Sequence, residues 1–393
     1  MTKLKEKENK LSVNISSIDD DYMKWRQQDK EYNESYKKWR KQNKGTTGFY
    51  FSQNPNELTY QHGVGFIKDY PEAVESSALK GISHYIGMSI IFFIMSDILC
   101  GNVLPLILSY LGFDIKIDLF VNKTYGNPLL ICSIYVLRQL LKVIYPIIIC
   151  IKKLKLPVQV MYPIKIINKP LFKLTVPVIM FFIGTSYVLT RLLIFLMDAM
   201  NINTNISQYY NSFNTKYSIL FFIITVILTP IISEFGIRCI FVQILRQFGD
   251  IFAIIIVSAV TAMMTFNLSS FCYIFINSVA VSYFLLRTGS IISSIIMRIM
   301  INLVDFIIIN LYYNIDHTSF DLITSSMCLI FIIIGIICIK LYAKKHTEKL
   351  DMKISTQHLP VSEKIITMLS SKAILISISL IFILFILNLK IRI

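Results

Sequence analysis

The sequence predicts an all-α, polytopic transmembrane helix bundle of about eight to nine spans, with an amphipathic helix ahead of the first span. Two observations carry this prediction. Apolar residues make up 54% of the 393 residues and charged residues only 16%, and the apolar residues form long, unbroken runs. A hydrocarbon core takes about 20 mostly apolar residues per helix. Because lipid offers the backbone no hydrogen-bond partners, each span must be helical.

Nine apolar runs meet or approach the length of a span. The fourth run is short by itself, but it continues through Glu234 and Arg238 to Leu245, so we expect a single helix there. The runs are Ser89–Leu111, Leu129–Ile151, Leu174–Met197, Ile219–Ile232, Ile251–Met264, Phe271–Leu286, Ile291–Leu311, Leu322–Leu341 and Ala373–Leu389.

Lysine and arginine concentrate in every second loop. Cytoplasmic loops carry an excess of these residues, which predicts a cytoplasmic N-terminus and places Asp114–Asn127 and Asn201–Lys216 outside. The loops predicted to be cytoplasmic are Lys152–Lys173, Arg246–Asp250, Arg287–Ser290 and Lys340–Lys372. A span at Ala373–Leu389 would put Lys390 and Arg392 outside, so the sequence leaves open whether that run crosses.

Charge and cysteine usage exclude several classes of function. The net charge is +15, but residues 1–80 are nearly balanced, with 14 Lys or Arg against 12 Asp or Glu. The excess lies beside the membrane, where topology and anionic headgroups explain it, so we expect no nucleic-acid partner. None of the seven cysteines forms a CxxC pair, so we expect no metal, no disulfide framework and no cofactor. The chain opens on a charged stretch, not on a signal peptide.

Residues 1–80 are expected to form a cytoplasmic segment, and residues 81–393 the membrane domain. Aromatic residues at spacings of three and four predict an amphipathic helix in the first part, and the Gly-, Asn- and Pro-rich residues 43–71 indicate a linker. The aromatic stripe consists of Tyr22, Trp25, Tyr32, Tyr36 and Trp39. Because Trp and Tyr suit interfaces, the helix could lie on its own membrane domain or the lipid surface, or it could dock a partner.

Ionisable side chains inside predicted spans indicate internal ion pairs or functional sites, because charge is costly in the membrane. Asp97 is one of them. Arg138, Lys142 and Arg191 are discounted in part, since long cations near helix ends can reach the interface.

The other intramembrane charges form two groups. Glu234 and Arg238 are four residues apart, so they share one helix face in the favourable acid-first order. Arg298, Asn302 and Asp305 share one face of a later helix, at spacings of four and three.

Three sequence blocks resemble a known family. Pro230-Ile-Ile-Ser-Glu-Phe-Gly-Ile-Arg-Cys resembles the first motif, Pro-x-x-Glu-Glu-x-x-x-Arg-Gly, of the CPBP family, the Abi or CAAX-protease-like glutamic intramembrane proteases. Arg246-Gln-Phe-Gly resembles the turn that follows. Arg287-Thr-Gly-Ser and then Arg298-x-x-x-Asn302 resemble the family's Arg-Thr-Gly-Ser…His-x-x-x-Asn stretch. The order and spacing agree over a core of about residues 217–308.

The resemblance implies a glutamic intramembrane endopeptidase, but the chain departs from the pattern at three site positions. The retained positions are Glu234, Arg238 and Asn302. The substituted positions are Ser233 for the first Glu, which is thought to activate water, Phe266 for the His of the second motif (Thr265 if the turn is one residue shorter) and Arg298 for the His of the third.

These substitutions leave no evident general base. Such a group needs a pKa that can approach the working pH. Ser233 has no base beside it, Arg298 cannot deprotonate, and Arg238 one turn away would hold Glu234 ionised and weakly basic. All five histidines are expected in loops or in the N-terminal segment. We therefore expect a structural ion network, in which Arg298 pairs with Glu234 and Asp305 or Asn302 accepts its other donors.

The sequence thus predicts a catalytically degenerate member of this family, which binds a peptide or a membrane-protein partner within the lipid bilayer. The alternative is an active intramembrane endopeptidase that uses Glu234 in a non-standard site. A transporter is disfavoured, because the chain shows no internal repeat. By analogy of fold, bacteriocin immunity or peptide processing is a suitable setting. Richness in Ile, Lys and Asn indicates an AT-rich bacterial genome, and hence the cell membrane as location. The partner and the oligomeric state stay open.

Overall fold

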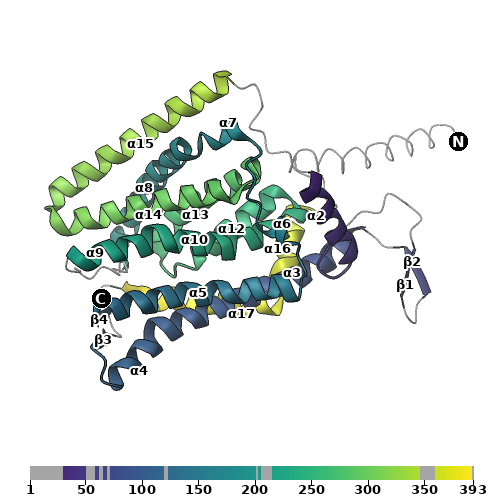
Figure 1. Cartoon of the computed structure of the whole chain (residues 1–393), viewed down its shortest axis with the longest axis horizontal. Helices are drawn as coiled ribbons and strands as arrows, with labels where there is room; N and C mark the ends of the chain where they lie inside the picture. The colour runs from purple at the N-terminus through teal and green to yellow at the C-terminus, as the bar shows by residue number, and fades with distance from the viewer. Residues whose placement is uncertain are drawn as a thin grey trace.

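Long helices make up most of the chain in the computed structural model, which describes residues 30–49, 58–61, 65–68, 71–118, 123–200, 202–204, 215–345 and 359–391 (Figure 1). The α-helices are α2 (Lys30–Gln42), α3 (Pro71–Ile98), α4 (Leu104–Tyr110), α5 (Pro128–Lys152), α6 (Val158–Met161), α7 (Lys169–Phe172), α8 (Thr175–Ala199), α9 (Thr215–Phe222), α10 (Thr229–Ser233), α11 (Cys239–Leu245), α12 (Asp250–Met263), α13 (Leu268–Thr288), α14 (Ile291–Asn314), α15 (His317–Lys345), α16 (Val361–Leu369) and α17 (Lys372–Asn388).

Short segments of other kinds interrupt or join these helices. The π-helical segments are η1 (Leu99–Val103), η2 (Ile223–Leu228) and η3 (Glu234–Arg238), and η4 (Arg246–Phe248) is a 3-10 turn. The antiparallel strand pairs are β1 (Leu58–Gln61) with β2 (Gly65–Lys68), β3 (Ile115–Asp118) with β4 (Lys123–Gly126), and β5 (Ile202–Thr204) with β6 (Leu389–Ile391).

Among the described residues, seven helical stretches are long and apolar enough to cross a membrane, or eight if α16 and α17, which meet at a bend of 81°, form one span. This confirms the predicted all-α, multi-pass fold. The seven are Glu72–Tyr110, Pro128–Lys152, Thr175–Ala199, Tyr217–Phe248, Leu268–Thr288, Ile291–Tyr312 and Thr318–Lys345.

One of the expected spans needs correction. The run Ile251–Met264 forms α12, a helix of 14 residues. At a rise of about 1.5 Å per residue α12 is about 21 Å long, which is shorter than a hydrocarbon core of about 30 Å. The division into residues 1–80 and 81–393 stays a prediction; α3, which begins at Pro71, extends across residue 80.

Apolar clusters hold the helices together, and the two largest among the described residues each join several helices. One includes Trp39, Leu79, Leu245 and Val257, and so joins α2, α3, α11 and α12. Another joins α8, α13 and α14 through side chains such as Ile183, Val281 and Met297. Many large apolar side chains on the outer faces are exposed, including Ile333 of α15 (54%), as expected for helices that face lipid.

Three loops predicted to be cytoplasmic, Lys152–Lys173, Arg246–Asp250 and Arg287–Ser290, lie at one end of the bundle, where α2, α6 and α16 also gather (Figure 1). Hydrogen bonds join them: the Ile291 N–H donates to the Pro163 carbonyl oxygen (2.8 Å), Lys364 Nζ to the Phe248 carbonyl oxygen (2.7 Å) and Trp39 Nε1 to the Leu154 carbonyl oxygen (2.7 Å). Segments that share one end of the bundle share one side of a membrane, and the assignment of that side to the cytoplasm stays a prediction.

The last apolar run extends along the bundle. α17 lies beside α3, and the helices approach closely at Gly87, where a Cβ would lie 2.5 Å from the Ala373 backbone. Beyond α17, β6 pairs with β5, with Lys390 opposite Asn203. The end of α17 therefore lies beside the segment that follows α8, at the end opposite α16, as expected if this run spans the membrane.

α2 packs on the bundle through its aromatic face. Tyr36 and Trp39 are 1% and 2% exposed, and the Tyr36 hydroxyl donates to the Gln243 carbonyl oxygen at 2.8 Å. For residues 30–42, the helix therefore lies against its own membrane domain, which was one of the two hypotheses for it. The predicted stripe also included Tyr22 and Trp25, which lie outside the described residues.

The alternation of loops gives a testable topology. A Leu350→Cys variant is expected to react with a membrane-impermeant maleimide only after permeabilisation, whereas Gln208→Cys should react in intact cells, because the lysine-rich loops stay in the cytoplasm. The unsubstituted protein measures labelling of the native cysteines. Strong labelling of Leu350→Cys in intact cells would overturn this orientation.

Candidate functional site

Glu234 and Arg238 lie on an irregular helical stretch. The apolar span Tyr217–Phe248 contains two π-helical segments, and η3 begins at Glu234 and ends at Arg238. Just upstream, the Thr229 hydroxyl donates to the Ile224 carbonyl oxygen five residues earlier (2.9 Å), and Pro230 can donate no backbone hydrogen bond. Single π-helical turns within α-helices are frequent at functional sites.

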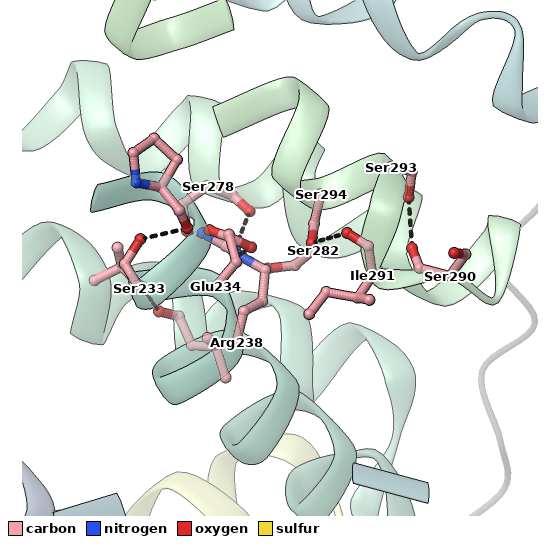
Figure 2. Close-up of polar contacts among 12 residues, drawn as sticks. Ser233, Glu234, Arg238, Ser278, Ser282, Ser290, Ile291, Ser293 and Ser294 are labelled. Carbon is pink, nitrogen blue, oxygen red and sulfur yellow. Dashed lines mark hydrogen bonds and ion pairs between the residues drawn. The ribbon is translucent and has the colours of Figure 1, made fainter. Parts of the chain in front are cut away.

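Glu234 and Arg238 form a buried ion pair. Arg238 Nε lies 2.7 Å from Glu234 Oε2, and both side chains are 3% exposed. Arg238 Nη1 also donates to the Ser278 carbonyl oxygen and hydroxyl, each at 3.0 Å, and to the Ser282 hydroxyl at 2.5 Å. Figure 2 shows these side chains between the helix of Glu234 and α13. The guanidinium thus joins the two helices, and the expected sharing of one face by Glu234 and Arg238 is confirmed.

Ser278 and Ser282 are the site residues that sequence reasoning missed. Both are fully buried on α13. Their hydroxyl groups accept hydrogen bonds from Arg238 on the adjacent helix. Their spacing of four residues in an apolar run was a signal, because two hydroxyls on one face of a buried helix need partners.

Gly236 brings a third helix close to the pair. A Cβ at Gly236 would lie 2.3 Å from a methyl group of Val143 on α5. A glycine between Glu234 and Arg238 is therefore required by the close packing of α5 against η3.

The expected pair between Arg298 and Glu234 is not formed, and that prediction is wrong. Among the described residues, Arg298 makes no ion pair within 4 Å and its Nη1 is buried without a hydrogen-bond partner. The Arg298 guanidinium is attracted by the Asp305 carboxylate on its own helix and repelled by the Arg238 guanidinium. Arg238, one turn from Glu234 on the same helix, contacts that carboxylate instead.

Asn302, the retained position of the third motif, forms a hydrogen bond to a neighbouring helix. Its Nδ2 donates to the Thr225 carbonyl oxygen in η2 at 2.9 Å. This bond joins α14 to the stretch that carries Glu234. The prediction that Asn302 accepts a donor of Arg298 is wrong.

The hydroxyl groups at the remaining motif positions donate to backbone carbonyl groups and not to Glu234. The Ser233 hydroxyl donates to the Pro230 carbonyl oxygen (3.0 Å) within its own helix. Phe266 lies in the turn between α12 and α13 with a positive φ of 52°, and beside it the Thr265 hydroxyl donates to the Ala262 carbonyl oxygen (2.7 Å). None of these hydrogen bonds involves Glu234.

Histidine placement differs from expectation at one position. His84 lies within α3 and not in a loop, with an exposed side chain, and His317 is the first residue of α15. His62, His346 and His358 lie outside the described residues. Among the described residues, no group of three His, Cys, Asp or Glu side chains could hold a metal ion.

A second buried cluster lies between α3 and α5. Asp97 Oδ1 contacts both Arg138 Nε (2.7 Å) and Lys142 Nζ, and Lys142 Nζ lies 4.1 Å from the centre of the Phe93 ring. The suggestion that these cations reach the interface is wrong, since all three charged side chains are at most 13% exposed. By contrast, Arg191 forms an exposed pair with Asp321 (3.0 Å).

The family turn Arg246-Gln-Phe-Gly anchors the N-terminal segment. Arg246 Nη1 donates to the Tyr32 hydroxyl at 2.5 Å. Gln247 Nε2 donates to the Thr47 carbonyl oxygen at 2.9 Å, and its Oε1 accepts the Phe49 N–H at 2.9 Å. This block therefore fixes the end of the Glu234 helix to residues 30–49.

A comparison with known protein families identifies the same part of the chain as the ion pair does. Residues 215–304 match the family model of the type II CAAX prenyl endopeptidases, Rce1-like. No curated protein and no solved structure gives a significant match. The matched residues extend from α9 into α14 and contain the Glu234–Arg238 pair, so the resemblance to the CPBP family is confirmed for this core. The chain is a multi-pass membrane protein, and its residues 215–304 are similar to the type II CAAX prenyl endopeptidases.

Proposed function

We propose that this protein is a catalytically degenerate member of the CAAX-protease type, which binds a peptide or a segment of a membrane protein and does not cleave it. The observation that carries the proposal is the buried Glu234–Arg238 pair. The one retained motif carboxylate is held in a structural contact, and the hydroxyl of Ser233 in the preceding position is turned to its own helix. Hydrolysis needs a positioned group that takes a proton from water.

Arg298 supports a binding role. It takes the place of a motif histidine, it cannot act as a base, and its Nη1 is buried without a partner among the described residues. A buried donor left unpaired costs about 1–3 kcal/mol. An acceptor on a bound segment would recover that energy, and a carboxylate or a peptide carbonyl group is such an acceptor.

The proposal includes the location of the protein, its orientation in the membrane and its biological context. The distribution of lysines supports insertion in a cell membrane with the N-terminus in the cytoplasm, and composition supports a bacterial source. The CPBP-like core at residues 217–308 would supply the binding site, and the Abi-type settings of bacteriocin immunity or peptide processing suit a member that binds without cleaving.

The proposal predicts that purified protein in lipid nanodiscs leaves a farnesylated CAAX-type peptide and a leader-type peptide intact, as judged by mass spectrometry. The physical reason is the absence of a free base at Ser233, Phe266 and Arg298. Photo-crosslinking with the same peptides measures binding, and Arg298→Met is expected to reduce the crosslink yield while Arg191→Met, at an exposed site, does not.

Cleavage that disappears in a folded Glu234→Gln variant would instead establish the alternative, an endopeptidase that uses Glu234. Melting curves of the variant in the same nanodiscs separate loss of activity from loss of fold. Absence of both cleavage and crosslinking would contradict binding of these two peptide classes.

A further inference from the structure

α16 lies across the end of the bundle and not along it. The helix axis turns by 81° between α16 and α17, and α17 runs beside α3 (Figure 1). Because α3 is part of an apolar span, α17 shares its direction through the membrane. α16 is therefore close to parallel with the membrane plane.

The contacts of α16 place it at the level where spans end. Lys364 Nζ donates to the carbonyl oxygen of Phe248, the last residue of the span Tyr217–Phe248 (2.7 Å). The same Nζ lies 3.1 Å from Glu75 Oε1, close to the start of the span Glu72–Tyr110. Just before α16, the Leu359 N–H donates to Glu75 Oε2 (3.0 Å). The ends of two spans thus fix α16 at the boundary between the hydrocarbon core and water.

One face of α16 is anchored in the protein, and the next face is apolar and exposed. Successive residues are about 100° apart on the helix, which puts the buried Lys364 and Met368 on one side. The adjacent side, an arc of about 140° around the helix axis, carries four apolar side chains that are 39–66% exposed. Ser362 is the polar residue within this arc. These apolar residues are Val361 (52%), Ile365 (39%), Ile366 (66%) and Leu369 (39%).

The remaining side of the helix is polar. Glu363, whose side chain is exposed, and Thr367 lie beyond the apolar arc. A helix with one face on protein, one apolar face exposed and one polar face has the pattern of an amphipathic helix in the plane of a membrane interface. Water would leave four apolar side chains exposed together, whereas the acyl-chain boundary would cover them and leave Glu363 in the headgroup region.

We infer that α16 is an interfacial helix whose apolar face, Val361, Ile365, Ile366 and Leu369, is covered by phospholipid acyl chains. The continuity of α16 with α17 and its level at the ends of two spans select lipid as the occupant. Through Lys364, this lipid-bound helix holds the C-terminal end of the helical stretch that carries Glu234. A cation is favourable there because the helix dipole leaves partial negative charge on the last carbonyl groups.

Tryptophan quenching in nanodiscs tests the inference on the full-length protein. The reporters are Ile366→Trp on the apolar face and the matched Glu363→Trp on the polar face, and the unsubstituted chain measures the emission of Trp25 and Trp39. Phosphatidylcholine brominated on its acyl chains is expected to quench the emission added by Ile366→Trp, and aqueous iodide the emission added by Glu363→Trp. Leu369→Trp is a second reporter of the apolar face and should behave as Ile366→Trp does.

Two results would overturn the inference. Quenching of the Ile366→Trp emission by iodide but not by brominated lipid would place this face in water. Quenching by neither would show that another protein surface, such as a second copy of the chain, covers it.

Discussion

Glu234→Gln is expected to lower the free energy of unfolding by about 3–5 kcal/mol, the cost of leaving the other half of a buried ion pair uncompensated. The carboxylate lies 2.7 Å from Arg238 Nε, and both side chains are 3% exposed. Arg298 interacts electrostatically with Arg238, so the change would also leave two cations without the acid that now contacts one of them. Equilibrium unfolding in mixed micelles measures the loss.

A second change distinguishes a broken pair from a general defect. The double variant Glu234→Gln with Arg238→Met should recover much of the loss, because an uncharged pair of similar volume leaves neither half of the ion pair as an isolated charge. Recovery would be incomplete, since Ser278 and Ser282 lose the donor that Arg238 now supplies.

Glu363→Gln is the matched control. Its side chain is exposed on α16, so the same change of chemistry should shift stability by no more than about 0.5 kcal/mol. If the double variant were as unstable as Glu234→Gln alone, the ion pair would not be the origin of the loss.

The sequence was sufficient to locate the apolar helices but not to show which of them are long enough to cross a membrane. Hydropathy marks residues that avoid water, and α12 is as apolar as a span because Phe252, Ala253, Ile254 and Val257 are buried by neighbouring helices. Burial in protein and burial in lipid select the same residue types. A run of about 14 residues therefore does not reveal whether it crosses the membrane or packs inside the bundle.

The candidate site was predictable where partners are close in sequence and failed where they are far apart. Glu234 and Arg238 meet because residues four apart share one helix face. The partner of Arg298 depended on how α14 is rotated against the Glu234 helix, which spacing along the chain does not determine. For the same reason sequence reasoning named Asp97, Arg138 and Lys142 without joining them, as Asp97 lies on α3 and the two cations lie on α5.

The cluster of Asp97, Arg138 and Lys142 supports the second large prediction. One carboxylate contacts two cations, and none of the three side chains is more than 13% exposed. Asp97→Asn would remove the one acid and leave two like charges together in an apolar environment. The free energy of unfolding is expected to fall by at least the roughly 3–5 kcal/mol that follows from breaking a single buried pair, as measured in the same mixed micelles.

The unequal numbers of acids and bases in this cluster make the prediction specific. Lys142→Met leaves Asp97 paired one-to-one with Arg138 at 2.7 Å, and it replaces an ammonium group beside the Phe93 ring with an apolar side chain of similar length. Because burying a charge is expensive even when it is paired, this change should be close to neutral or stabilising. The two variants are therefore expected to differ by several kcal/mol although each removes one charge. Equal losses in the free energy of unfolding for the two variants would contradict the prediction. They would show that Asp97 stabilises the packing of α3 against α5 without compensating the charges of Arg138 and Lys142.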